Sequence, residues 1–283
     1  MLRITRMLTA FAAGAILSLC GLFMQALVRN PLADPYLLGA SSGAGLGVVL
    51  ITTGLIPFML FQSIWFIPLI AFVGSCISLF IVLVLGQIRK DAETYRLLIA
   101  GIAVSSFFTA LTGLVLYKFA AADSLRNVMF WTLGSFQRSS FESAMTGLVG
   151  IIVALLFGWT QGRTLDVLSL GGRHAYSLGL NTPVFRIWIL LITAFCTGSI
   201  TAFTGPVGFV GLMIPHFSRG FVGANHRKNT TVSAALGGVY LVGCDTIGRL
   251  MLPPAGLPIG IITALLGIPF FIFLLLRKPK SKI

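Results

Sequence analysis

Long apolar runs, separated by short polar segments, dominate the sequence. A helix needs about 20 apolar residues to cross the hydrocarbon core of a bilayer. Eight runs are predicted to do so: Met7–Val28, Leu37–Leu60, Ile64–Gly86, Leu97–Lys118, Ser143–Gly158, Val184–Phe203, Val232–Leu252 and Leu257–Leu276. A ninth segment, Val207–Val222, contains Pro215 and Arg219, so we expect a short or broken helix there. The pattern predicts one all-α, polytopic transmembrane helical bundle of about nine spans, in a single domain over residues 1–283.

Composition favours the same class. Hydrophobic residues make up 57% of the chain and charged residues 10%, whereas soluble domains carry about 25% charged residues. The net charge of +13 comes from short basic clusters between apolar runs, which is typical of membrane loops. Aromatic and basic residues do not alternate as in surfaces that stack bases, so we expect no nucleic-acid partner.

The basic residues also predict an orientation, because cytoplasmic loops of membrane proteins are enriched in Lys and Arg. With a cytoplasmic C-terminus and nine spans, 14 of the 20 basic residues lie inside. The other six are Arg3, Arg6, Lys118, Arg126, Arg138 and Arg249. We therefore expect a multi-pass protein of the cell (inner) membrane, with its N-terminus outside.

Several kinds of chemistry lack their signatures. The four cysteines lie singly within apolar runs, and the three histidines are isolated from one another. No HExxH, GxSxG or GxxxxGK[ST] pattern occurs, so a zinc enzyme, a membrane hydrolase and an ATPase are all disfavoured. We expect no cofactor, no metal site and no enzymatic activity in this chain. If transport is driven by ATP, another subunit must hydrolyse it.

Asp245 is the acidic residue that lies well inside an apolar run. Ion-coupled carriers keep such residues as relays, so an ion-coupled secondary transporter is the alternative function. Arg249 follows four residues later on the same helical face, which favours a local ion pair.

Two segments rich in Gly and Pro, Asn30–Gly47 and Gly205–Gly223, each follow a strong span. The spans before them run in opposite directions in the predicted topology, which hints at an inverted repeat.

Three motifs carry a family resemblance. The segment after the first span reads Asn30-Pro-Leu-Ala-Asp-Pro-Tyr-Leu-Leu-Gly-Ala-Ser-Ser-Gly-Ala. The second reads Gly205-Pro-Val-Gly-Phe-Val-Gly-Leu-Met-Ile-Pro-His-Phe-Ser-Arg, and the third reads Leu257-Pro-Ile-Gly-Ile-Ile-Thr-Ala-Leu-Leu-Gly-Ile-Pro-Phe-Phe. In this order they resemble the FecCD or BtuC-like family, the permeases of ABC importers for iron–siderophores, haem or vitamin B12.

The resemblance implies a type II importer fold and a set of partners. These are a second permease copy or a close paralogue, two cytoplasmic ABC ATPase subunits, an extracytoplasmic substrate-binding protein and membrane lipid. Family members have ten helices per subunit, and the helix that usually precedes the Arg3–Arg6 region is missing from this sequence. The expected function is import of a metal chelate, an iron–siderophore first of all, by alternating access.

The resemblance also implies roles for single residues. Arg3, Arg6 and Arg249 match positions that dock acidic residues of the binding protein. Asn30, Leu32, Thr94 and Tyr95 match the inner gate, although Asn30-Pro31 also reads as a plain helix stop.

Five hydroxyl residues are candidates for the lining of the translocation path: Ser41, Ser42, Ser105, Ser106 and Thr109. Their alternative role is hydrogen bonding within or between transmembrane helices.

The segment Thr164–Pro183 is too polar to span the membrane and resembles the family's coupling helices, which contact the ATPase. We read it as a loop with two short helical patterns broken by glycines. Its candidate contact residues are Leu168, Leu170, Gly171, Arg173, Ala175, Leu178 and Gly179.

Overall fold

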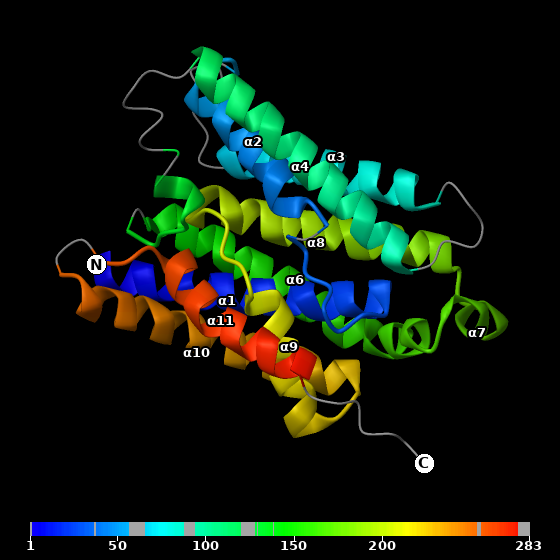
Figure 1. The fold of residues 1–283 in the computed structure, drawn as a ribbon. Helices are drawn as coiled ribbons and strands as arrows, with labels where there is room; N and C mark the ends of the chain where they lie inside the picture. The colour runs from blue at the N-terminus through cyan, green and yellow to red at the C-terminus, as the bar shows by residue number, and fades with distance from the viewer. Residues whose placement is uncertain are drawn as a thin grey trace.

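The computed structural model describes residues 2–36, 38–56, 66–87, 94–119, 128, 130–137, 139–253 and 256–276. In these residues the regular structure is helical (Figure 1). Six helices are long and apolar enough to cross a membrane: α1 (Leu2–Val28), α3 (Phe66–Gln87), α4 (Thr94–Phe119), α6 (Phe141–Ser169), α8 (Thr182–Thr204) and α10 (His226–Met251). Four shorter helices accompany them: α2 (Ala40–Thr52), α7 (Gly172–Ser177), α9 (Val210–Val222) and α11 (Ile259–Leu276). The prediction of an all-α polytopic bundle is confirmed.

Helix α2 is shorter than the predicted span Leu37–Leu60. It has 13 residues, which correspond to about 20 Å of helix, so it cannot cross a hydrocarbon core of about 30 Å. It begins only after Gly39, whose φ of 90° lies in the left-handed region that interrupts a helix. Helix α9 fulfils the expectation of a short helix, with 13 residues and Pro215 inside.

Helix α6 is longer than the predicted span Ser143–Gly158, and it takes in the first part of the predicted loop Thr164–Pro183. The two short helical patterns expected in this segment are present, but the first, Thr164–Ser169, continues α6 without a break because Leu165 and Leu168 bury these last turns against the bundle. Side-chain polarity alone did not reveal those two contacts. Only the short α7 and its flanking residues separate α6 from α8.

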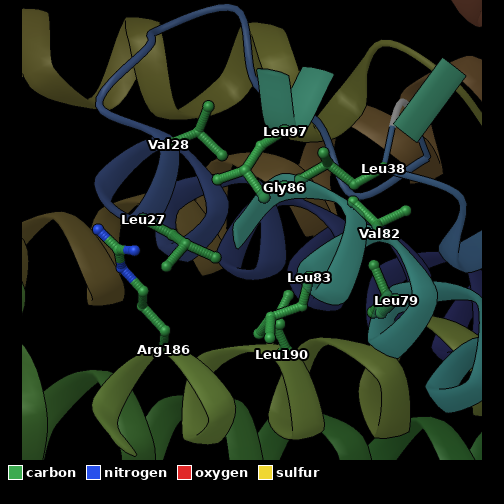
Figure 2. A pocket seen from close by; sticks show the side chains of 10 residues that line it. All are labelled: Leu27, Val28, Leu38, Leu79, Val82, Leu83, Gly86, Leu97, Arg186 and Leu190. Atoms are coloured by element: carbon green, nitrogen blue, oxygen red, sulfur yellow. The ribbon is translucent and has the colours of Figure 1, made fainter. Parts of the chain in front are cut away.

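The bundle contains two similar halves. Helix α1 packs against the short α9 and against α10, and α8 packs in the same way against the short α2 and against α3. This arrangement supports the inverted repeat that the two Gly- and Pro-rich segments suggested. A narrow apolar pocket lies where α1, α3 and α8 meet, with Arg186 at its edge (Figure 2).

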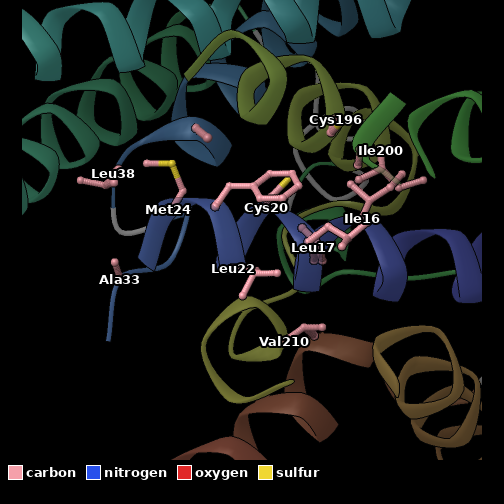
Figure 3. Close-up of a cluster of buried hydrophobic side chains, with 14 of the residues drawn as sticks. Ile16, Leu17, Cys20, Leu22, Met24, Ala33, Leu38, Cys196, Ile200 and Val210 are labelled. Carbon is pink, nitrogen blue, oxygen red and sulfur yellow. The ribbon is translucent and has the colours of Figure 1, made fainter. Parts of the chain in front are cut away.

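Helix α1 runs through the core. Most of the residues in its apolar stretch are buried. Its side chains Ile16, Leu17 and Met24 pack with residues of α8 and α9 (Figure 3). Small residues allow this close packing. A Cβ atom added to Gly14 would fall on the carbonyl oxygen of Gly237 in α10. The backbones of α1 and α10 therefore touch, as small residues permit in membrane bundles.

Candidate functional site

The two Gly- and Pro-rich motifs meet at Tyr36. Its hydroxyl lies 3.1 Å from Thr201 Oγ1 of α8 and accepts a hydrogen bond from the Val207 backbone N–H at 3.4 Å. One phenol thus joins the loop after α1 to the end of α8 and to the second motif. The sequence analysis quoted Tyr36 within its motif but gave it no role. It is the one aromatic residue of the segment Asn30–Gly47, and this was the available signal.

A second contact joins the same regions. Gln25 Nε2 of α1 donates to the carbonyl oxygens of Gly211 and Leu212 at 3.2 and 3.3 Å. A Cβ atom on Gly211 would lie 2.8 Å from Asp34 Oδ2, so this position of α9 accepts only glycine without a shift. Asp34 in turn accepts from the Tyr36 backbone N–H at 2.8 Å. Polar contacts inside the bundle therefore connect the two motifs.

The predicted gate residues Asn30 and Leu32 lie directly beyond the end of α1. Asn30 Oδ1 accepts from the Leu32 N–H at 2.9 Å, and Arg29 just before them has a φ of 51°. These features end helix α1 at this point. The alternative interpretation of Asn30-Pro31 as a helix stop therefore fits the structure. Thr94 and Tyr95 begin α4, but their side chains lie outside the described part. The gate role stays a prediction.

The predicted path hydroxyls divide into two groups. Ser42, Ser106 and Thr109 donate to backbone carbonyls of their own helical segments at 2.8–3.0 Å, which is the alternative role that the sequence left open. Ser105 Oγ is buried and has no partner among the described residues. Ser41 is half-buried in the first turn of α2.

Ser105 belongs to a cluster of hydroxyls around Gly39. A Cβ atom on Gly39 would lie 2.5 Å from Ser78 Oγ, 3.4 Å from Ser105 Oγ and 3.7 Å from Ser42 Oγ. Ser78 of α3 is fully buried, and the sequence analysis did not select it. The cluster joins α2, α3 and α4 at one point, and whether it lines a path is untested.

The three arginines that the sequence predicts to lie outside are not equivalent. Arg6 Nη2 lies 2.6 Å from Asp245 Oδ1, and its Nε donates to both carboxylate oxygens at 3.1 and 3.0 Å. Arg249 Nε lies 3.3 Å from Asp245 Oδ2. Arg3 is exposed. The local pair of Asp245 and Arg249 is therefore present, and Arg6 is the stronger partner that helical spacing could not reveal. We call this side of the bundle the Arg6 end.

The predicted coupling segment lies at the opposite side of the bundle, where α1 ends and α8 begins. We call it the α7 end. Leu168 and Ala175 are buried, whereas Leu170, Tyr176 and Leu178 are 66%, 75% and 65% exposed. The segment therefore presents apolar side chains outward on a short helix. Tyr176 was not among the selected residues, and its place between the selected Ala175 and Leu178 was the missed signal.

Glycines bound this short helix on both sides. Gly171 and Gly179 have φ values of 118° and 82°, a region that residues with a Cβ atom rarely adopt. The side chain of Arg173 lies outside the described part. The coupling role of these residues stays a prediction.

An open pocket of about 600 Å³ lies beside the coupling segment. Polar residues that the sequence analysis left without a role line it, among them Arg29, Asp166, Arg219 and His226. His226 Nδ1 lies 2.6 Å from Asp166 Oδ1, which links α10 to the last turns of α6. No group of three or more His, Cys, Asp or Glu side chains in the described residues is placed to hold a metal ion.

Comparison with known proteins identifies the arrangement. The model of the FecCD transport family matches residues 1–277. The chain belongs to the FecCD transport family. It is a multi-pass membrane permease subunit of an ABC transporter, not an enzyme, and the resemblance drawn from its three motifs is confirmed.

Individual relatives agree with this assignment. The chain is 35% identical to the hemin transport system permease protein HmuU of Yersinia pestis, over 99% of this chain and 84% of that protein. It is 33% identical to the Fe(3+) dicitrate transport system permease protein FecD of Escherichia coli, over 97% of this chain and 84% of that protein. It is 37% identical to the vitamin B12 import system permease protein BtuC of Klebsiella pneumoniae, over 98% of this chain and 82% of that protein.

A solved structure shows the same architecture. It is a metal-chelate type ABC transporter in an inward-facing conformation, with a TM-score of 0.83 and 29% identity, and the match covers 98% of this chain and 87% of that chain. PsaBC from Streptococcus pneumoniae shares the fold, with a TM-score of 0.69 at 16% identity over 99% of this chain and 93% of that chain.

Proposed function

We propose that this permease imports a metal chelate into the bacterial cytoplasm by alternating access, driven by ATPase subunits. The family match carries the proposal. Its relatives are named for hemin, ferric dicitrate and vitamin B12, and each of these solutes is a metal held by an organic ligand. The substrate class is therefore a metal chelate of this kind, with an iron–siderophore first among the candidates.

The coupling segment supports the proposed ATPase contact. Leu170, Tyr176 and Leu178 are exposed at the α7 end, and exposed apolar side chains of this kind mark protein contacts. In the proposed orientation this end and the C-terminus face the cytoplasm. Two ATPase subunits bind there, and their closure on ATP moves α7 and, with it, α6 and α8.

The binding protein docks at the Arg6 end in this proposal, where Arg3 is the exposed cation. Arg6 and Arg249 share the single negative charge of Asp245. The group of three side chains keeps one net positive charge, which contributes to docking. The cargo then passes along the interface of two permease copies, where Ser41, Ser105 and the predicted gate residues would lie.

The ion-coupled alternative is not favoured. An ion site at Asp245 needs a free carboxylate, but two arginines already contact this one at 2.6 and 3.3 Å. A cation would have to displace both guanidinium groups.

The test is reconstitution of the permease, its ATPase and its binding protein in proteoliposomes. Radiolabelled haem, a ferric siderophore and cobalamin are offered in turn, with ATP enclosed. We expect one of them to accumulate only with ATP and binding protein. Accumulation driven by a proton or sodium gradient without ATP would refute the proposal.

A further inference from the structure

An open pocket of about 330 Å³ lies on the surface of the bundle, between the second half of α6 and the first turns of α10. Trp159 of α6 lines it together with Arg227, Lys228 and Thr231 of α10. It shares none of these residues with the larger pocket beside the coupling segment. None of the four has a role in the transport cycle proposed above.

Two glycines hold the helices together beside this pocket. A Cβ atom on Gly158 would lie 2.5 Å from Thr230 Oγ1 of α10, and one on Gly162 would lie 2.9 Å from Arg227 Cβ. The start of α10 therefore lies directly on α6. The backbone of Arg227 is fixed by this packing although the residue is exposed, so the pocket is formed by two packed helices and not by loops.

The indole ring of Trp159 is tied across the pocket. Its Nε1 donates a hydrogen bond to Thr231 Oγ1 at 3.0 Å. Trp159 is nevertheless 41% exposed. A tryptophan that has its N–H satisfied and part of its apolar ring uncovered is typical of the membrane–water interface, where such rings lie at the level of the headgroups.

Both helices change polarity at this pocket. In α6 the apolar run ends at Gly158, and a mainly polar stretch, Thr160–Ser169, follows Trp159. In α10 the first residues, His226–Thr231, are polar, and the apolar run starts at Val232. Two independent changes of polarity thus place the pocket at the edge of the hydrocarbon core, within reach of lipid headgroups.

The two cations of the pocket have no counter-ion in the part of the chain that the structure describes. Arg227 and Lys228 are exposed and form no ion pair with any described residue. The nearby carboxylate of Asp166 is engaged by His226, whose Nδ1 lies 2.6 Å from Oδ1. An anionic ligand would complement both cations, and arginine and lysine side chains both bind phosphate groups.

An exposed apolar stripe continues from the pocket towards the middle of the membrane. On α6, Leu156 and Ile152 lie one and two turns before Trp159 and are 53% and 48% exposed. On α10, Val239 lies two turns after Thr231 and is 66% exposed. Residues three or four positions apart share a helical face, so both stripes are in line with the pocket. An acyl chain can lie along them, whereas a free phosphate ion gains nothing from them.

We propose that this pocket binds the headgroup of an anionic phospholipid, of which phosphatidylglycerol is the simplest example. Arg227 and Lys228 hold the phosphate, Trp159 lies at the level of the glycerol backbone, and one acyl chain follows Leu156 and Ile152. The lipid then bridges α6 and α10 close to the turns that lead into α7. The proposal requires only that these two helices span a membrane, and it depends neither on the cargo nor on the orientation.

Quenching of Trp159 fluorescence by brominated lipids tests the proposal. The other tryptophans, Trp65, Trp131 and Trp188, are replaced by phenylalanine, and the permease is reconstituted in phosphatidylcholine vesicles with increasing fractions of brominated phosphatidylglycerol. A parallel series contains brominated phosphatidylcholine. We expect half-maximal quenching at an about tenfold lower fraction of the anionic lipid, because each of two basic residues near the surface favours it by up to about fivefold.

Charge variants locate the preference. Arg227→Gln should reduce it about fivefold, and the further change Lys228→Gln should abolish it. Both positions are exposed, so the fold tolerates these changes, and unchanged quenching by brominated phosphatidylcholine verifies this. Lys118→Gln is the matched control, since it removes one positive charge from α4, which packs on α2 and α3, and it should keep the full preference. Excess inorganic phosphate, at constant ionic strength, should not relieve the quenching.

Three results would overturn the proposal. Equal quenching of the unchanged pocket by the two lipids would show that the headgroup is not recognised. Relief of the quenching by inorganic phosphate would assign the pocket to a free anion. Absence of quenching by either lipid would show that protein, such as a second permease copy, covers this face.

Discussion

Arg6 and Asp245 lie 239 positions apart in the sequence and form a bidentate ion pair, with Nη2 and Oδ1 at 2.6 Å. The pair fastens the start of α1 to the end of α10. Asp245 is 5% exposed and Arg6 21%, so water screens this contact only partly. Asp245, which the sequence analysis considered as an ion relay, instead links two helices of the bundle.

Asp245→Asn should therefore destabilise the bundle. The substitution leaves Arg6 partly buried without its anion, and we expect a loss of about 1–3 kcal/mol in the free energy of unfolding. Thermal unfolding in detergent, followed by tryptophan fluorescence, measures it. Arg6→Gln combined with Asp245→Asn should cost less than the sum of the single changes, because the two residues act as a pair. Strict additivity would show that the contact contributes nothing.

Arg3→Glu should slow docking of the binding protein at low ionic strength. Arg3 is exposed and forms no ion pair within the described residues, whereas Arg249→Glu would also place a second carboxylate beside Asp245 and confuse the result. Rim charges act chiefly on the association rate and are screened by salt. The measurement is surface plasmon resonance on nanodiscs at low and high salt. Arg163→Glu, an exposed site on the last turns of α6, is the control and should dock normally.

Gly179→Ala should uncouple the permease from its ATPase. A Cβ atom meets nothing there, but the φ of 82° makes a left-handed alanine cost about 1–2 kcal/mol. Transport and stimulated ATPase activity should fall while the permease still reaches the membrane. Gly243→Ala is the matched control, since its site in α10 is equally open and its backbone is helical. Full transport in Gly179→Ala would remove the reason for placing the contact at this turn.

Gly14→Ala should damage the fold far more than Gly113→Ala. The first Cβ atom falls on the Gly237 carbonyl, whereas the second meets open space. Backbone cannot retreat as a side-chain tip can, so we expect a loss of about 3 kcal/mol or more for Gly14→Ala. The yield of folded permease and its melting temperature measure both. Equal behaviour of the two variants would show that α1 and α10 do not touch through their backbones.

The proposed orientation has its own test. A cysteine at Leu178, which is 65% exposed at the α7 end, should resist an impermeant maleimide in sealed cells, and one at Tyr117, which is 91% exposed near the end of α4, should react. Cys20, Cys196 and Cys244 are buried, and the partly buried Cys76 is replaced by Ser to keep the background low. The opposite pattern would reverse the topology. The segment Arg126–Arg138, which the basic-residue rule also places outside, begins and ends in residues outside the described part.

The sequence predicted the fold class and the family because both depend on local signals: apolar runs, turn motifs and their order. It could not predict where α2 begins, since the left-handed backbone at Gly39 lies against Ser78 and Ser105, which come from other helices. It missed the long end of α6 for a similar reason, because the contacts of Leu165 and Leu168 come from other helices. Helical spacing revealed the pairing of Asp245 with Arg249, but no rule of spacing connects Asp245 to Arg6.

The length of α6 also fixes a distance. Its 29 residues correspond to about 43 Å, compared with about 30 Å for the hydrocarbon core. The polar last turns, Thr160–Ser169, account for about 15 Å of this helix and lead straight into α7. Helix α6 is thus long enough to extend from the hydrocarbon core into the headgroup region, which is about 40–45 Å thick in all with the core, and to place α7 there. Any subunit that binds α7 must therefore meet it near the headgroup level, and removing four residues from the end of α6 would draw that subunit about 6 Å closer to the core and rotate its contact surface by about 40°.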